Sequence, residues 1–118
     1  MNFDTIVHGG KVVTPAGVTE IDIGIEGEKI TALEAGLGET PNGAKLLDAS
    51  GQIVLPGVID VHVHLELPFC GTVTSDDYRS GTRAAARGGV TTFMDFAIPY
   101  GEESLGEALD NWHRRAEG

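Results

Sequence analysis

The chain has 118 residues, enough for one ordinary domain, and contains one cysteine. A lone cysteine excludes a scaffold held by internal disulfides. The 8 lysines and arginines face 18 aspartates and glutamates, a net charge of −10 with neutral histidines. This balance argues against binding to nucleic acid or an anionic membrane surface, since both require basic clusters. Because we find neither a basic, apolar leader nor an apolar run of ~20 residues, we expect a cytoplasmic protein.

The first 52 residues are predicted to form short, mainly antiparallel strands joined by glycine-containing turns. In residues 18–26, isoleucines alternate with polar or small residues, which is the period-two pattern of a half-buried strand. Shorter strands are expected at 5–8, 11–14 and 29–33. Three glycines and a proline predict a loop over residues 36–44.

From residue 52 onward the pattern alternates between strands and helices. Strands are predicted at 52–55, 58–65 and 90–97, and helices at 76–87 and 104–116. Ser75 is the expected N-cap of the first helix, and a Ser104-x-x-Glu107 capping box begins the second. This order implies parallel strand pairing. Two such βα units are a fraction of a barrel that typically needs ~250 residues, so the chain is expected to be truncated.

Two histidines occupy one face of the predicted strand at 58–65. Positions 59, 61, 63 and 65 are apolar, whereas Asp60, His62 and His64 alternate with them. The two histidines are expected ~7 Å apart at Cα, a spacing from which two imidazoles can bind one divalent ion such as Zn²⁺. The alternative is a pair of structural histidines. Asp60 is expected to orient this segment rather than to bind metal directly.

These residues belong to a longer stretch that resembles a known enzyme family. Residues 56–64, PGVIDVHVH, resemble the first metal-binding strand of the amidohydrolase superfamily. Residues 65–77, LELPFCGTVTSDD, together with 80–92 and the pair Asp95–Phe96, resemble the dihydropyrimidinases and D-hydantoinases within that superfamily. The resemblance is weakest over residues 1–50, which are similar to the start of the family's small β-sandwich domain.

The resemblance implies a fold and a reaction. Residues 1–52 would form part of the sandwich domain, and residues 53–118 the first two βα units of a TIM-like (β/α)₈ barrel. Members of the family hydrolyse cyclic amides of dihydropyrimidines and 5-substituted hydantoins as homotetramers, with two zinc ions per subunit. His62 and His64 would bind the more buried zinc ion.

The resemblance also implies residues that this chain does not contain. A carboxylated lysine bridging the zinc ions, two further histidines and a catalytic aspartate are expected downstream of residue 118. Lys11, Lys29 and Lys45 precede the histidine strand, and Asp95 and Asp110 match no such role. The catalytic residues therefore stay unassigned, and the 118-residue chain by itself is expected to be inactive.

The loop at 65–75 is longer than the ~2–6 residues usual after a barrel strand. By resemblance, Leu65, Leu67 and Phe69 would contact the substrate's exocyclic substituent. The alternative is that they pack the loop onto the barrel. Cys70 is predicted to be a small buried side chain rather than a reactive thiol.

Three other functions compete with the dihydropyrimidinase and hydantoinase activities as interpretations of this sequence. Dihydroorotase is disfavoured, because its pattern has an arginine directly after His-x-His, where this chain has Leu65. Allantoinase stays possible, although it fits the Leu-Pro-Phe loop less well. A non-catalytic scaffold of the collapsin-response-mediator type is the alternative from another functional class. Those proteins lack the metal histidines, whereas this chain has both His62 and His64.

Overall fold

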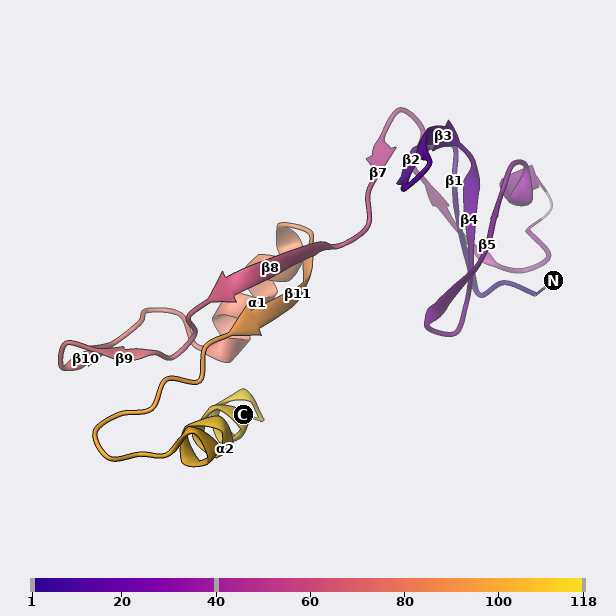
Figure 1. The fold of residues 1–118 in the computed structure, drawn as a ribbon. Coiled ribbons are helices and arrows are strands. Elements are labelled where there is room, and N and C mark those ends of the chain that lie inside the picture. Colours follow the sequence, from indigo (N-terminus) through magenta and orange to yellow (C-terminus); the bar gives the residue numbers. More distant parts are fainter. Residues whose placement is uncertain (1, 40, 118) are drawn as a thin grey trace. The chain divides into compact units, whose positions relative to one another are not determined.

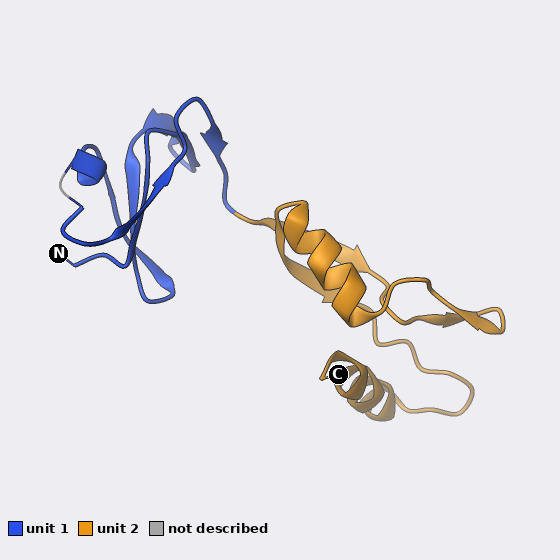
Figure 2. Ribbon diagram, turned by 180° about the vertical axis from the view of Figure 1, so that it is seen from behind, with its two compact units in different colours: residues 1–56 blue, residues 57–118 orange. Residues whose placement is uncertain are grey.

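The structure is a computed structural model that describes residues 2–39 and 41–117. It divides into two compact units, residues 1–56 and residues 57–118 (Figure 2). The sequence pattern changes at residue 52, so the structural division falls four residues later. Within the two described ranges, we find no helix long and apolar enough to span a membrane.

The first unit contains two small sheets (Figure 1). One has the strand order β5-β4-β1-β6 and the other the order β3-β2-β7. Their bounds are β1 Thr5–His8, β2 Lys11–Thr14, β3 Gly17–Glu20, β4 Asp22–Glu26, β5 Lys29–Glu34, β6 Lys45–Asp48 and β7 Ile53–Val54. Strand β6 was not predicted. It pairs parallel with β1, as β7 does with β2, so the expected antiparallel arrangement is only partly correct.

The predicted strand at 18–26 is interrupted at Ile21, and its halves β3 and β4 belong to different sheets. Asp22, which the alternation placed on the polar face, is only 8% exposed. Its carboxylate accepts hydrogen bonds from the amides of Gly9 (3.2 Å) and Gly38 (3.0 Å). Gly38 lies in the short 3₁₀ helix η1 (Leu37–Glu39), inside the predicted loop. Asp22 is buried because it supplies acceptors to two loops.

The second unit contains two parallel strands, β8 (Val58–Val63) and β11 (Val90–Asp95), as predicted. Helix α1 (Tyr78–Arg87) connects them, and helix α2 (Leu105–Ala116) follows β11 (Figure 1). Both strands end two residues before their predicted ends. The loop after β8 forms an unpredicted hairpin of β9 (Pro68–Phe69) and β10 (Thr72–Val73).

The two helix starts differ in how well the sequence predicted them. Helix α2 begins at the predicted capping box of Ser104 and Glu107. Helix α1 is capped by Asp77 rather than Ser75. The Asp77 carboxylate accepts from the Ser80 amide (2.6 Å), and the Ser80 hydroxyl accepts from the Asp77 amide (3.1 Å). This reciprocal pair satisfies two amides, an arrangement that Ser75 would not provide at the same helix start.

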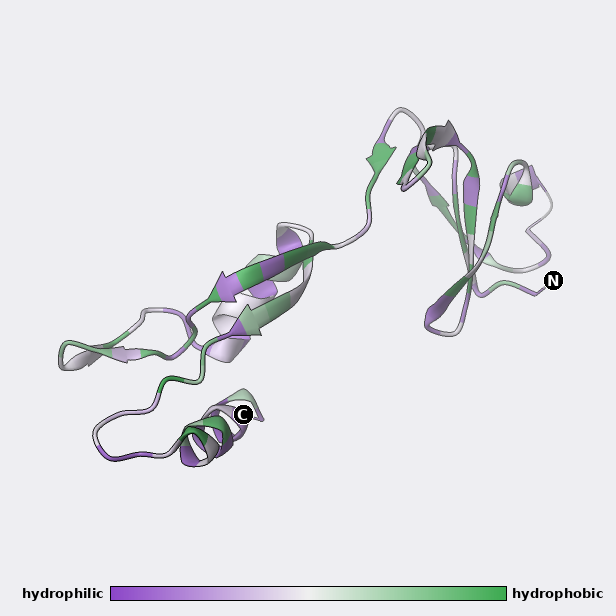
Figure 3. Ribbon diagram, in the orientation of Figure 1, coloured by the Kyte–Doolittle hydropathy of each residue, from purple (hydrophilic) through white to green (hydrophobic). Residues whose placement is uncertain are grey.

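Apolar side chains of the second unit are unevenly buried. Ala108 and Trp112 of α2 are buried as predicted, whereas Leu105 is exposed. On β8, Ile59 and Val61 are 57% and 63% exposed, although the alternation predicted this face to pack under helices. Hydrophobic and hydrophilic residues alternate along β8 in Figure 3. Both strands thus have apolar side chains that the described residues of this unit leave exposed.

Candidate metal centre

The end of β8 brings the rings of His62 and His64 together. The two Nε2 atoms lie 3.0 Å apart. The ring centroids are 4.9 Å apart, with an interplanar angle of 79°. The Nε2 atoms of both side chains thus face one another, although one residue separates the two histidines in the sequence.

A third ring, that of Phe96, lies against both histidines. Its centroid is 4.5 Å from that of His62 and 5.3 Å from that of His64. Strand register explains the approach: the last residues of the two strands, Val63 and Asp95, are paired, so the residues that follow them, His64 and Phe96, lie side by side. The sequence analysis assigned Phe96 no role at the site. Two features could have indicated this contact: the parallel pairing of the two strands, and the position of Phe96 directly after the second strand.

Asp60 acts on the backbone of the histidine segment. Its Oδ1 accepts a hydrogen bond from the His62 amide (3.1 Å). This contact fixes the local backbone between the two residues and leaves both imidazole rings free. The arrangement supports an orienting function for the Asp60 carboxylate.

The two imidazoles fit a zinc ion as a donor set. Tetrahedral Zn²⁺ with Zn–N bonds of 2.0–2.1 Å needs nitrogens about 3.3 Å apart, close to the 3.0 Å separation of the Nε2 atoms. The Nδ1 atom of His64 is buried and has no hydrogen-bond partner among the described residues. Those residues also contain no cluster of three or more histidine, cysteine, aspartate or glutamate side chains suited to a metal. The pair therefore offers two of the three protein ligands usual in catalytic zinc sites.

The three apolar candidates in the loop after β8 fall into two groups. Leu65 and Leu67 are 7% and 9% exposed, whereas Phe69 is 65% exposed. The Leu65 side chain lies over Gly81 of α1, where a Cβ atom would come within 2.3 Å of it. The structure therefore favours packing for Leu65 and Leu67 and leaves Phe69 free to contact a ligand.

Side chains from distant segments hold this loop. Arg115 of α2 donates to the Glu66 carbonyl oxygen (2.5 Å), and the Tyr100 hydroxyl donates to the Pro68 carbonyl oxygen. Within the loop, the Leu67 amide donates to the Thr74 hydroxyl (3.0 Å). These bonds give the segment that carries Phe69 a defined conformation.

Cys70 does not have the predicted buried environment. It is exposed and lies in the turn of the β9–β10 hairpin, with a positive φ of 51°. The turn projects from the unit, so no described element covers the thiol.

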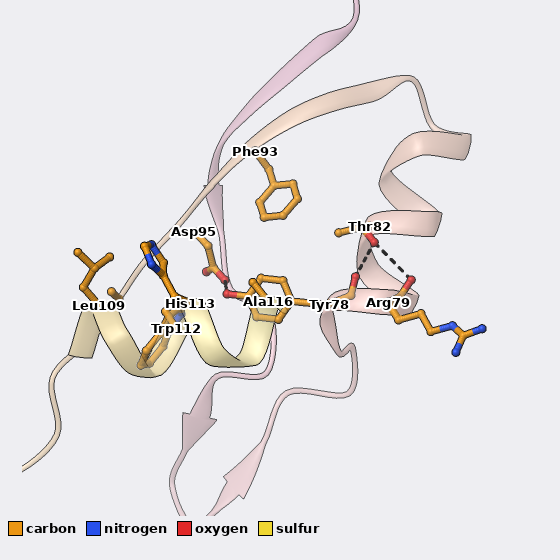
Figure 4. A pocket seen from close by; sticks show the side chains of 10 residues that line it. Tyr78, Arg79, Thr82, Phe93, Asp95, Leu109, Trp112, His113 and Ala116 are labelled. Atoms are coloured by element: carbon orange, nitrogen blue, oxygen red, sulfur yellow. Dashed lines mark hydrogen bonds between the residues drawn. The ribbon is translucent and has the colours of Figure 1, made fainter. Parts of the chain in front are cut away.

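A pocket of 660 Å³ lies between α1, β11 and α2 (Figure 4). Inside it, the Tyr78 hydroxyl donates a hydrogen bond to Asp95 Oδ2 (2.5 Å). Burial, and then the bonded carboxylate, raise the pKa of Tyr78 above its ordinary value. The second oxygen, Asp95 Oδ1, accepts from the Phe96 amide (2.8 Å). Asp95, to which the sequence gave no role, thus joins a helix start to a strand end.

Comparison with known proteins gives the family context of this geometry. The amidohydrolase family matches residues 53–115. A D-hydantoinase of Streptomyces coelicolor is 44% identical over 121 residues, covering 100% of this chain and 26% of that protein. A dihydropyrimidinase of Rattus norvegicus is 41% identical, covering 95% of this chain and 22% of that protein.

A solved structure agrees with these sequence relatives. The D-hydantoinase from Bacillus sp. AR9 superposes with a TM-score of 0.86 at 46% identity, covering 94% of this chain and 24% of that one. An allantoinase of Bacillus licheniformis is also similar, 46% identical over 83% of this chain and 21% of that protein. The chain therefore spans about a quarter of the length of these relatives.

Proposed function

Because the chain belongs to the amidohydrolase family, we propose that it carries the first metal-binding strand of a zinc-dependent cyclic-amide hydrolase. The substrates would be dihydropyrimidines and 5-substituted hydantoins. The observation that carries the proposal is the 3.0 Å approach of the His62 and His64 Nε2 atoms within the family-matched segment. In this proposal, residues 53–118 begin an eight-stranded barrel, and the first 52 residues belong to a β-sandwich domain.

His62 and His64 would hold zinc through their Nε2 atoms. A bound zinc ion supplies a Lewis acid and lowers the pKa of bound water, the chemistry that amide hydrolysis needs at neutral pH. The chain's own residues hold the two imidazoles in place. Asp60 fixes the backbone at His62, and the Phe96 ring limits the rotation of both histidines. Neutral imidazole ligands add no charge of their own to the site beyond that of the metal.

Phe69 would contact the exocyclic substituent of the substrate. It is exposed on a hairpin that Arg115 and Tyr100 anchor, and the hairpin follows the histidine strand directly. Leu65 would support the hairpin by packing the loop onto α1 at Gly81, and Leu67 is buried within the same loop. Substituting Phe69 with alanine should change the relative kcat/KM for small and bulky 5-substituents and leave zinc content unchanged.

The decisive experiment uses the full-length protein that contains this chain. Zinc content and ring opening of hydantoin and dihydrouracil are measured for the wild type and for His62→Ala and His64→Ala. We expect both variants to lose hydrolysis and zinc, because each lacks one metal-binding nitrogen. His8→Ala is the matched control, since His8 belongs to the first unit. Unchanged zinc in the His62→Ala/His64→Ala double variant would refute the proposal.

Allantoin is the informative competing substrate, because the allantoinase of Bacillus licheniformis is as similar in identity as the hydantoinases. Faster turnover of allantoin than of hydantoin and dihydrouracil would assign the protein to that activity. Zinc binding without turnover of any of the three would favour a non-catalytic scaffold. We also propose a cytoplasmic homotetramer, which light scattering of the full-length protein tests.

A further inference from the structure

We propose that Tyr78, Asp95 and Phe96 form a positioning relay that sets the orientation of the two metal-binding histidines from the start of helix α1. This proposal rests on the metal-binding function proposed for His62 and His64. The relay runs from the Tyr78 hydroxyl to the Asp95 carboxylate, to the Phe96 backbone and finally to the two imidazole rings.

The first step joins two elements that are distant in sequence. Tyr78 is the first residue of α1, and Asp95 is the last residue of β11. Their 2.5 Å hydrogen bond involves a carboxylate acceptor in a partly buried site, where such bonds are short and strong. Figure 4 shows the tyrosine hydroxyl meeting the Asp95 side chain between the elements that line the pocket.

The second step fixes the residue that follows the strand. The same carboxylate accepts from the Phe96 amide through its other oxygen (2.8 Å). Because Tyr78 holds Oδ2, the plane of the carboxylate is set, and Oδ1 is directed at the amide. The pocket of 660 Å³ leaves open space beside Asp95. Hydrogen bonds rather than close packing therefore determine the side-chain orientation.

The third step transfers this orientation to the histidines. The Phe96 ring lies within 4.5 Å and 5.3 Å of the His62 and His64 centroids, at interplanar angles of 33° and 47°. The ring is 42% exposed, so burial alone does not hold it. His64 Nδ1 has no partner in the described part of the chain, and the hydrogen bond that His64 Nε2 makes is to His62 Nε2, the atom with which it would share the metal. An aromatic neighbour can provide the orientation that a hydrogen-bonded partner usually gives a metal-binding histidine.

The first test observes the metal-free full-length protein that contains this chain by nuclear magnetic resonance. The ring of Phe96 should shift the carbon-bound ring protons of both histidines. We expect Phe96→Leu to remove this ring-current shift, Phe96→Tyr to keep it, and Tyr78→Phe to reduce it. Phe93→Leu and Tyr100→Phe are matched controls: the first makes the same change within β11, three residues before Phe96, and the second removes a hydroxyl outside the relay. Both should keep the shift.

The second test titrates the same proteins with Zn²⁺. Loss of the partners that orient metal ligands typically weakens affinity about 10–100-fold. We expect a loss in this range for Phe96→Leu, a smaller loss for Tyr78→Phe, and wild-type affinity for Phe96→Tyr and both controls. If Phe96→Leu does not fold, Tyr78→Phe and Phe96→Tyr decide the question.

The two proposals fail in different ways. Wild-type ring shifts and zinc affinity in Tyr78→Phe, or in folded Phe96→Leu, would overturn the relay while leaving the metal site intact. Zinc affinity that survives the His62→Ala/His64→Ala double variant would overturn the proposed metal site. The ring shifts of the metal-free full-length protein would then still report whether Tyr78 orients the rings.

Discussion

The two units of this chain bury their apolar side chains by different means. In the first unit, strands of two sheets surround a small core that includes Ile6, Val12 and Ile23, and Asp22 is buried by bonds to two loops. In the second unit, buried side chains gather under the loop and along α2, while Ile59 and Val61 of the histidine strand are exposed. The strand that carries the candidate metal ligands is thus less enclosed by the described residues than β1, β2 and β4 of the first unit.

This contrast shows what each region requires from its surroundings. The first unit satisfies its buried polar groups internally. The second presents two imidazoles and several apolar strand residues whose burial needs further elements, as an eight-stranded barrel would provide. The following predictions test that difference, beginning with the largest expected effect.

The largest effect concerns catalysis by the second unit. The purified 118-residue chain should give no turnover of hydantoin or dihydrouracil, with or without added Zn²⁺. Two imidazoles form an incomplete zinc site, and the described residues contain no third metal-binding side chain beside them. Chromatographic detection of the ring-opened product measures this. Metal-dependent turnover that disappears in His62→Ala would show the comparison to be wrong.

The next effect concerns the packed loop. Leu65→Ala should destabilise the second unit by about 2–4 kcal/mol, because it removes a buried side chain that contacts α1 at Gly81. Phe69→Ala, in the same loop but exposed, should change stability far less. Urea denaturation followed by Trp112 fluorescence measures both variants. Equal losses of stability in the two variants would contradict the assignment of Leu65 to packing and of Phe69 to ligand contact.

A smaller loss is expected in the first unit from Asp22→Ala. The variant leaves the Gly9 and Gly38 amides without their acceptor, which costs roughly 1.5–3 kcal/mol. Amide hydrogen exchange in β1 and β4 reports on this unit separately from the second. Asp48→Ala is the matched control, since the exposed Asp48 accepts from the amide of Ser50. A control loss as large as that of Asp22→Ala would contradict the special importance of the buried carboxylate.

The smallest effect is a pH dependence at the start of α1. Hydrogen bonds from the Ser80 amide and hydroxyl lower the pKa of Asp77 below its ordinary 3.8. The folded form then favours the ionised carboxylate. The cap therefore contributes fully to stability above pH 3.8, and this contribution is lost as the pH falls through the lowered pKa of Asp77. Exchange of the Ser80 amide should accelerate there. Asp77→Asn, which keeps an acceptor but does not titrate, should abolish this pH dependence.

Local patterns explain which elements the sequence predicted well. The Ser104–Glu107 capping box and the stripe containing Trp112 depend on side chains within one helix, so α2 was readily recognised. Parallel pairing of β8 and β11 followed from strand–helix alternation. Strand β6 was missed because its sequence, KLLD, shows no alternation of apolar and polar residues, and β9 and β10 because each has only two residues. These strands form because their backbones pair with a neighbouring strand, and their own residue patterns do not indicate that pairing.

By itself, the sequence determined that His62 and His64 share a strand face, and the surrounding motif determined the family to which they belong. Only tertiary structure decided the 3.0 Å approach of their Nε2 atoms and the burial of Leu65 and Leu67 beside an exposed Phe69. It also decided that Tyr78, Asp95 and Phe96 meet. Residue types and spacing are local properties of the chain, whereas these contacts depend on strand register and on which helix packs against which strand.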